Sequence, residues 1–230
     1  MKFGVIVFPG SNCDRDMIHA LQEDLQHEVI TLWHKDKDLS MFSTEDCIVL
    51  PGGFSYGDYL RCGAVARFSP IMEQVVKFAN EGGKVLGVCN GFQILCESGL
   101  LPGALLLNDH QKFTCKNVYI KSENSMNLIG RNVGDMALMI PVAHGEGRYY
   151  ADAATMEQLS KNDQVVFRYC DENGEIHINS NPNGAINNIA GICNEGRNVF
   201  GMMPHPERAC SEDLNNIDGK AILEAFTHMN

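Results

Sequence analysis

The sequence lacks the features that would direct it to a membrane or a nucleic acid. No apolar run approaches the roughly 18 residues of a membrane span, and residues 1–10 have neither the apolar core nor the cleavage site of a signal peptide. Basic residues are scarce, since 18 Lys and Arg stand against 29 Asp and Glu and leave a net charge of −11. That balance disfavours nucleic acid and anionic membranes as main partners, and we expect a soluble, cytoplasmic protein.

Metal and nucleotide motifs are also missing. The nine cysteines form no Cys-x-x-Cys pair, and they are not spaced with the eight histidines as zinc ligands would be. An odd cysteine count without an export signal predicts reduced thiols rather than disulfides. Neither G-x-G-x-x-G nor G-x-x-x-x-G-K-[ST] occurs. We therefore expect no metal and no nucleotide cofactor in this chain.

The hydrophobic pattern is that of an α/β protein. The chain has 230 residues, of which 44% are hydrophobic, enough to bury a large core. In the first half, short apolar runs at 3–8, 29–33, 47–50 and 84–88 alternate with helical spacing. This alternation predicts an open, mostly parallel flavodoxin-like sheet with helices on both faces. From about residue 104 the runs become β-rich, which predicts extra strands in the second half of a single domain, 1–230.

One strand-to-helix junction has the form G-x-C-x-G, in Gly87-Val88-Cys89-Asn90-Gly91. This is the pattern of a nucleophile elbow, a turn so tight that both flanking positions must be glycine. At a helix N-terminus, the dipole and the free N–H groups favour a thiolate. We predict that Cys89 is a nucleophile exposed above the sheet. The alternative, on this pattern alone, is a buried cysteine beside packing glycines.

A thiol nucleophile needs a base, and His205 is the histidine best placed to serve. Pro206 follows it, which disfavours helical geometry at His205 and predicts an extended segment. In such a segment Glu207 faces the same side at about 6.6 Å, so it could hold one imidazole nitrogen while the other faces the thiol. We predict a triad of Cys89, His205 and Glu207. Without Cys89, the segment would be only a proline-rich turn.

A glycine pair near Cys89 indicates where the negative oxygen formed during the reaction would be stabilised. Attack by a thiolate creates a negative oxygen, and the backbone N–H of Asn90 would donate to it by position. Gly52 and Gly53 end the neighbouring strand and can present a second donor, because glycine permits an exposed backbone turn. We predict an oxyanion hole made of Gly52, Gly53 and Asn90.

The segment 54–61 follows this glycine pair and carries side chains typical of protein interfaces. Phe54, Tyr56 and Arg61 are of the residue types enriched there, and we predict that they contact a partner. The alternative is an ordinary loop whose aromatic side chains pack back on the sheet.

Taken together, these motifs resemble a known family. G-V-C-N-G-F-Q at 87–93 and H-P-E at 205–207 are similar to the class I (triad) glutamine amidotransferases. Further stretches resemble one branch of that class, the glutaminase subunits of a purine-biosynthesis synthase. They are F-P-G-S-N-C-D (8–14), P-G-G-F-S-Y-G-D-Y-L-R (51–61), H-G-E-G-R-Y (144–149), N-P-N-G (181–184) and G-M-M-P-H-P-E-R (201–208). The likeness therefore covers nearly the whole chain.

The resemblance implies a reaction and partners. Cys89 would attack the side-chain amide of glutamine to form a glutamyl thioester, while His205 protonates the departing ammonia and then activates water. Gln93 matches a position that helps to hold glutamine in this class, and Gly145 lies in a loop whose backbone does the same. The ammonia would pass to a larger synthase subunit, which is joined by a small accessory subunit. That synthase subunit, and not this chain, would use ATP and Mg.

Two other interpretations are compatible with parts of the sequence. A γ-glutamyl hydrolase, or another hydrolase with a cysteine elbow, could share Cys89, and hydrolysis of γ-glutamyl peptides would reveal it. A flavodoxin-like binding module could instead seat a phosphate at residues 9–12, before the first predicted helix. An absorbance spectrum would then show a bound flavin.

Overall fold

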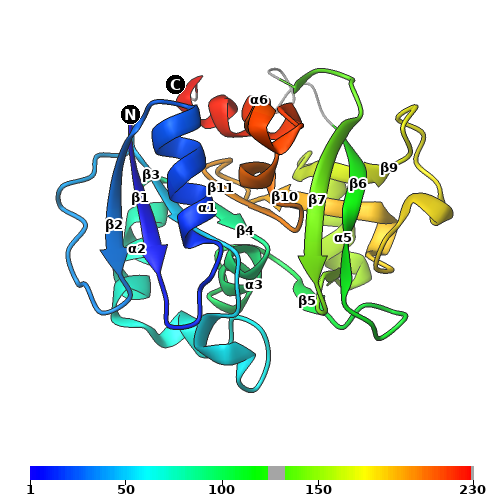
Figure 1. The fold of residues 1–230 in the computed structure, drawn as a ribbon. Helices are drawn as coiled ribbons and strands as arrows, with labels where there is room; N and C mark the ends of the chain where they lie inside the picture. The colour runs from blue at the N-terminus through cyan, green and yellow to red at the C-terminus, as the bar shows by residue number, and fades with distance from the viewer. Residues whose placement is uncertain (124–132, 229–230) are drawn as a thin grey trace.

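The computed structural model describes residues 1–123 and 133–228 (Figure 1). The strands are β1 (Lys2–Val7), β2 (Glu28–Trp33), β3 (Cys47–Leu50), β4 (Lys84–Val88), β5 (Ala104–Leu106), β6 (Thr114–Ser122), β7 (Leu138–His144), β8 (Arg148–Tyr150), β9 (Val165–Cys170), β10 (Ile189–Cys193) and β11 (Val199–Met202). The α-helices are α1 (Asp14–His19), α2 (Pro70–Asn80), α3 (Asn90–Glu97), α5 (Ala153–Lys161) and α6 (Asp218–Ala225). A π-helical segment, η1 (Ala20–Asp24), continues α1. The 3-10 turns are η2 (Ser55–Asp58), η3 (Ala66–Phe68), η4 (Ile178–Ser180), η5 (Ile186–Asn188), η6 (Pro206–Arg208), η7 (Glu212–Leu214) and η8 (Phe226–His228).

The parallel half of the main sheet has the predicted architecture. Strands follow the order β2-β1-β3-β4-β11, and each pairs in parallel with its neighbours. Every residue of β3 and β4 is buried, as expected for parallel strands covered on both faces. Figure 1 shows α1 in front of this half and α2 behind it. The α/β fold class with helices on both faces is confirmed.

Antiparallel strands extend the sheet beyond β11. Their order is β10-β9-β6-β7, and β5 pairs with β8 in a separate two-stranded sheet. These strands are the extra β-rich segments expected in the second half. A single hydrophobic core of buried side chains runs through both halves. None of the described helices is long and apolar enough to cross a membrane.

The sequence pattern does not predict β7 or β8. Along β7 buried and half-buried positions alternate, but the half-buried ones hold Met139, Pro141 and Ala143, so no polar period marks the strand. Proline is tolerated there because β7 lies at the edge of the sheet. Near the end of the chain, residues 212–214 form η7, and the helix α6 begins at Asp218.

Candidate active site

Cys89 lies at a strained turn between β4 and α3. Its backbone has φ 51° and ψ −104°, a conformation that side-chain-bearing residues rarely adopt. A Cβ at Gly91 would lie 1.8 Å from the Leu50 carbonyl oxygen, and one at Gly87 would lie 2.7 Å from the Gly91 carbonyl oxygen. The positions two residues before and two residues after Cys89 therefore require glycine, and the structure has the elbow geometry expected from the G-x-C-x-G pattern.

The exposure expected for Cys89 is wrong. Only 5% of the residue is exposed, because the end of β7 lies over the elbow. The Cys89 Sγ lies 3.7 Å from the carbonyl oxygen of Ala143, to which it donates a weak hydrogen bond. Because the sequence pattern does not predict β7, it also does not predict that Cys89 is buried.

His205 and Glu207 form a buried pair. The imidazole Nδ1 lies 2.6 Å from Oε1 of the Glu207 carboxylate, and both side chains are almost fully buried. The extended segment predicted for 205–207 is wrong, since Pro206 opens the 3-10 turn η6. Proline fits the first position of such a turn because its φ is fixed and it has no N–H to satisfy. The turn returns Glu207 to its histidine, so the predicted pairing holds by a different backbone route.

The charges around His205 favour its protonated form. Burial alone would lower the pKa of His205, but the charges of Glu207 and Cys89 outweigh burial and raise the pKa to about 10. Nε2 is the nitrogen left for Cys89. Among the described residues Nε2 is buried and has no hydrogen-bond partner, yet Cys89 lies close enough to raise the pKa of His205. At neutral pH the site therefore holds a proton ready for a leaving group.

Two of the three residues predicted for an oxyanion hole lie near this pair, whereas Gly53 packs against Asn12, whose backbone nitrogen would be 2.6 Å from an added Cβ. β3 and β4 are paired in register, Leu50 opposite Gly87, so the segments that follow them emerge at the same edge of the sheet. Gly52 lies so close to the imidazole that an added Cβ would be 2.6 Å from Cε1 of His205. Asn90 begins α3 directly after Cys89 and is buried. The structure thus brings Gly52 and Asn90 to one place, while their role in catalysis remains a prediction.

The two predicted glutamine-binding positions also lie together. Gln93 is one helical turn after Cys89 and is buried. Its Nε2 donates to the carbonyl oxygen of Glu146 at 2.7 Å, and Glu146 follows Gly145 in the loop after β7. The Asn108 side chain fixes this loop, since it donates to the His144 carbonyl oxygen and accepts from the Gly147 N–H.

The predicted interface residues are placed unequally. Phe54 is 44% exposed and stacks on Phe113, with ring centroids 6.4 Å apart. Arg61 is exposed and forms an ion pair with Glu97 at 2.7 Å. Exposure is greatest at Tyr59 and Leu60, 74% and 83%, which the sequence pattern does not single out.

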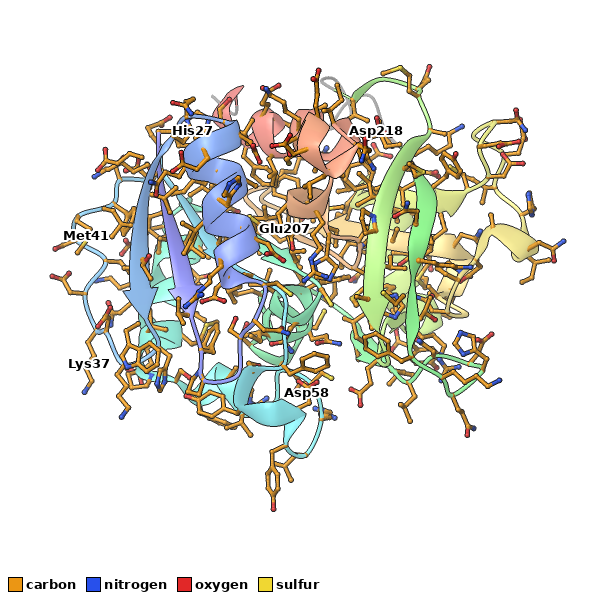
Figure 2. The ribbon with its side chains drawn as sticks, in the orientation of Figure 1. His27, Lys37, Met41, Asp58, Glu207 and Asp218 are labelled. Carbon is orange, nitrogen blue, oxygen red and sulfur yellow. The ribbon has the colours of Figure 1, made fainter. Side chains whose placement is uncertain are left out.

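Tyr56 departs from the expectation for this loop. Its ring is partly buried against the core, and its hydroxyl is hydrogen-bonded to Nδ1 of His34 at 2.7 Å and to Oγ of Ser69 at 2.8 Å. The side chain therefore anchors the loop instead of presenting a free surface. In Figure 2 the loop, marked by Asp58, lies at the lower edge of the molecule, while Glu207 lies near its middle.

Arg208 is a site residue that the motif contains but the sequence does not explain. Its Nε donates to Asp16 Oδ2 at 2.9 Å and its Nη2 donates to the Cys13 sulfur at 3.1 Å. These contacts fasten the His205–Glu207 turn to the start of α1. Arg208 adjoins Glu207 in the sequence, but its partners lie more than 190 residues away, and no local pattern relates them. In the part of the chain that the structure describes, no group of three or more His, Cys, Asp or Glu residues could hold a metal ion.

The fold and the site define a class of protein. The family model of the CobB/CobQ-like glutamine amidotransferase domain matches residues 1–227, and the chain belongs to that family. It is therefore a glutamine amidotransferase, as the sequence motifs predict. The chain is 54% identical over 227 residues to phosphoribosylformylglycinamidine synthase subunit PurQ of Moorella thermoacetica, covering 98% of this chain and 95% of that relative.

Other comparisons agree. The chain is 54% identical over 228 residues to the PurQ subunit of Koribacter versatilis, with 98% of this chain and 97% of the relative covered. Among solved structures, PurLQS from Thermotoga maritima matches with a TM-score of 0.84 and 42% identity over 98% of this chain and 96% of that one. A glutamine amidotransferase from Thermotoga maritima has a TM-score of 0.56 at 14% identity, over 98% and 90% of the chains, and shows the fold alone.

Proposed function

We propose that this chain is the glutaminase subunit of a phosphoribosylformylglycinamidine synthase. It hydrolyses glutamine and delivers ammonia to a larger subunit, which converts formylglycinamide ribonucleotide to formylglycinamidine ribonucleotide in IMP biosynthesis. The observation that carries the proposal is the Cys89 elbow beside a buried His205–Glu207 pair joined at 2.6 Å. The names of relatives that are 52–54% identical support this particular reaction.

The first half-reaction releases ammonia. The Cys89 thiolate attacks the side-chain amide carbon of glutamine, and a C–S bond forms while the carbonyl electrons move to oxygen. In this proposal, the N–H groups of Asn90 and of the Gly52–Gly53 turn stabilise that oxygen. His205 gives its Nε2 proton to the amide nitrogen, the C–N bond breaks, and ammonia leaves a glutamyl thioester. Glu207 favours the protonated imidazole that this step uses.

The second half-reaction restores the enzyme. Neutral His205 takes a proton from water, whose oxygen attacks the thioester carbon. The C–S bond then breaks, and glutamate leaves with Cys89 again a thiolate and His205 again protonated. The sum is glutamine and water to glutamate and ammonia. Gln93 and the backbone of Gly145 hold the amino-acid end of the substrate in this proposal.

The use of the ammonia belongs to partner subunits. The similarity to PurLQS supports an assembly in which this chain serves a larger synthase subunit together with a small accessory subunit. ATP and Mg are assigned to the synthase subunit, whereas this chain is assigned no cofactor. The cytoplasmic location expected from the sequence is part of the same proposal. The segment 54–61, with Phe54 and Arg61 exposed, is where we place the contact with the synthase subunit.

Cysteine labelling tests this function sharply, because the cysteine predicted to be most reactive is not the most exposed one. Cys89 is buried, whereas Cys115 on β6 is exposed. A glutamine-like electrophile should label Cys89 alone, and Cys89→Ala should abolish ammonia release from glutamine while the control Cys115→Ala retains it. Peptide mass spectrometry and an ammonia assay measure the two effects. Labelling of Cys115 in place of Cys89, or a fully active Cys89→Ala chain, would overturn the proposal.

A further inference from the structure

The side chain of Asn90 makes contacts that its backbone role does not require. It is almost fully buried, and its Oδ1 accepts the N–H of Ser55 at 3.2 Å. Its Nδ2 donates to Oε1 of Gln93 at 2.9 Å and to Oδ1 of Asp58 at 3.4 Å. The Asn90 amide therefore contacts α3 through Gln93, the segment after Gly53 through Ser55, and the loop 54–61 again through Asp58.

These contacts continue into a chain of two amides whose direction is fixed. The Ser55 N–H can only donate, so the Asn90 oxygen must face it. Nδ2 of Asn90 therefore faces Gln93 and sets the Gln93 oxygen toward itself. Nε2 of Gln93 then donates to the Glu146 carbonyl oxygen at 2.7 Å, a group that can only accept. A backbone donor at one end and a backbone acceptor at the other permit a single orientation of both amides.

We propose that Asn90 is a positioning residue whose side chain aligns the two sides of the oxyanion hole and orients the Gln93 amide toward Glu146, in the loop proposed to bind glutamine. The inference rests on the proposed glutaminase function and deepens it. The backbone of Asn90 supplies one predicted oxyanion donor. Its side chain holds Ser55, two residues after Gly53, and the Gly52–Gly53 turn supplies the donor predicted on the other side of the oxyanion hole. The link from Asn90 to Asp58 connects both to the loop at the proposed partner surface.

We call the chain of hydrogen bonds from Ser55 through Asn90 and Gln93 to Glu146 the relay. The variant Asn90→Asp tests its direction while preserving the shape of the side chain. The new carboxylate still accepts from Ser55, but its second oxygen faces the oxygens of Gln93 and Asp58. If Gln93 turns round to donate to it, its own oxygen meets the Glu146 carbonyl, so either orientation breaks the relay. Asn90→Ala removes the relay without adding charge.

Asn198→Asp is the matched control. The Asn198 Nδ2 donates to the carbonyl oxygens of Ala79 and Gly83, both at 2.8 Å, so the substitution removes a comparable donor. Asn198 precedes β11 and lies at the end of the sheet opposite to the elbow. It should lower the thermal midpoint with kcat/KM for glutamine within about threefold of wild type, because the relay is intact.

The measurements are kcat and KM for glutamine, with the full chain in complex with its synthase subunits, and Cys89 labelling. Loss of one oxyanion donor costs about 10²–10³ in rate, so both Asn90 variants should lose at least about 100-fold in kcat/KM. Labelling of Cys89 by a diazoketone analogue of glutamine should fall in parallel, whereas labelling by iodoacetamide should change less than about threefold, since the thiol itself is untouched.

Three results decide the matter. Activity of both Asn90 variants within about threefold of wild type would overturn the inference. An equal fall in both labelling rates would overturn it too, because Asn90 would then only support the local fold. A wild-type chain that releases no ammonia would instead refute the proposed glutaminase, and the relay would be decided by the two labelling rates alone.

Discussion

Gly52→Ala is a steric probe of the position of the His205 imidazole, the proposed base. An added Cβ at this position would meet Cε1 of His205 at 2.6 Å and the Cys13 sulfur at 3.3 Å. Gly52 has no positive φ, so the backbone itself tolerates alanine. The obstacle is therefore the imidazole, whose Nδ1 is held by Glu207 at 2.6 Å.

The expected loss follows from this distance. The contact is about 0.8 Å short of the 3.4 Å at which ordinary carbon contacts begin, so His205 must move by a comparable amount or the strand end must shift. A misplacement of about 1 Å can cost about 100-fold in rate. Overpacking of this kind destabilises by about 1–3 kcal/mol, which leaves the chain folded. We expect kcat/KM for glutamine to fall about 100-fold, with a modest drop in the thermal midpoint.

The assay is ammonia release by the complex, with urea unfolding of the same preparations. Gly196→Ala is the control, because Gly196 is exposed, has no positive φ, and an added Cβ would meet the Asn198 side chain and no residue of the candidate active site. A Gly52→Ala enzyme within about threefold of wild-type kcat/KM would refute the reasoning. It would mean that catalysis does not depend on the imidazole position described above.

Two further predictions concern charge and partner contact. The pKa of His205 rises from 6.5 to about 10 in the folded chain, so its bound proton stabilises the fold fully below pH 6.5, and this contribution is lost as the pH rises to about 10. Glu207→Gln should flatten that slope in urea midpoints measured between pH 6.5 and 10, and an unchanged slope would contradict the pairing. Arg61→Ala should weaken stimulation of glutaminase activity by the synthase subunit while thermal stability stays within experimental error, since exposed ion pairs contribute little. If the synthase subunit stimulates the wild-type chain and the Arg61→Ala variant equally, Arg61 is not part of the proposed contact.

Local patterns predicted the parts of the site that depend on local geometry. The elbow at Cys89 follows from two glycines, because backbone crowding between Gly91 and Leu50 is set by the adjacent strands. The His205–Glu207 pair follows from spacing, although the backbone route is a 3-10 turn and not an extended segment. Those predictions needed only neighbours in sequence or in a parallel sheet.

Long-range packing accounts for what the sequence did not show. The burial of Cys89 depends on β7, whose hydrophobic pattern has no clear period and contains Pro141. Tyr56 points inward because His34 and Ser69, from two other segments, capture its hydroxyl. Such contacts join residues with no common motif, so only the folded chain reveals them.

The position of β11 in the sheet has a consequence for how the protein is made. β11 pairs directly with β4, Met202 opposite Val88, so everything between Cys89 and β11 is an excursion between two neighbouring strands. On a ribosome, Cys89, the proposed nucleophile, is synthesised more than a hundred residues before His205, the proposed base, which follows β11. At about 5–20 residues per second, this leaves several seconds during which Cys89 exists without His205. If Cys89 and His205 have the proposed roles, a nascent chain that ends before His205 cannot hydrolyse glutamine.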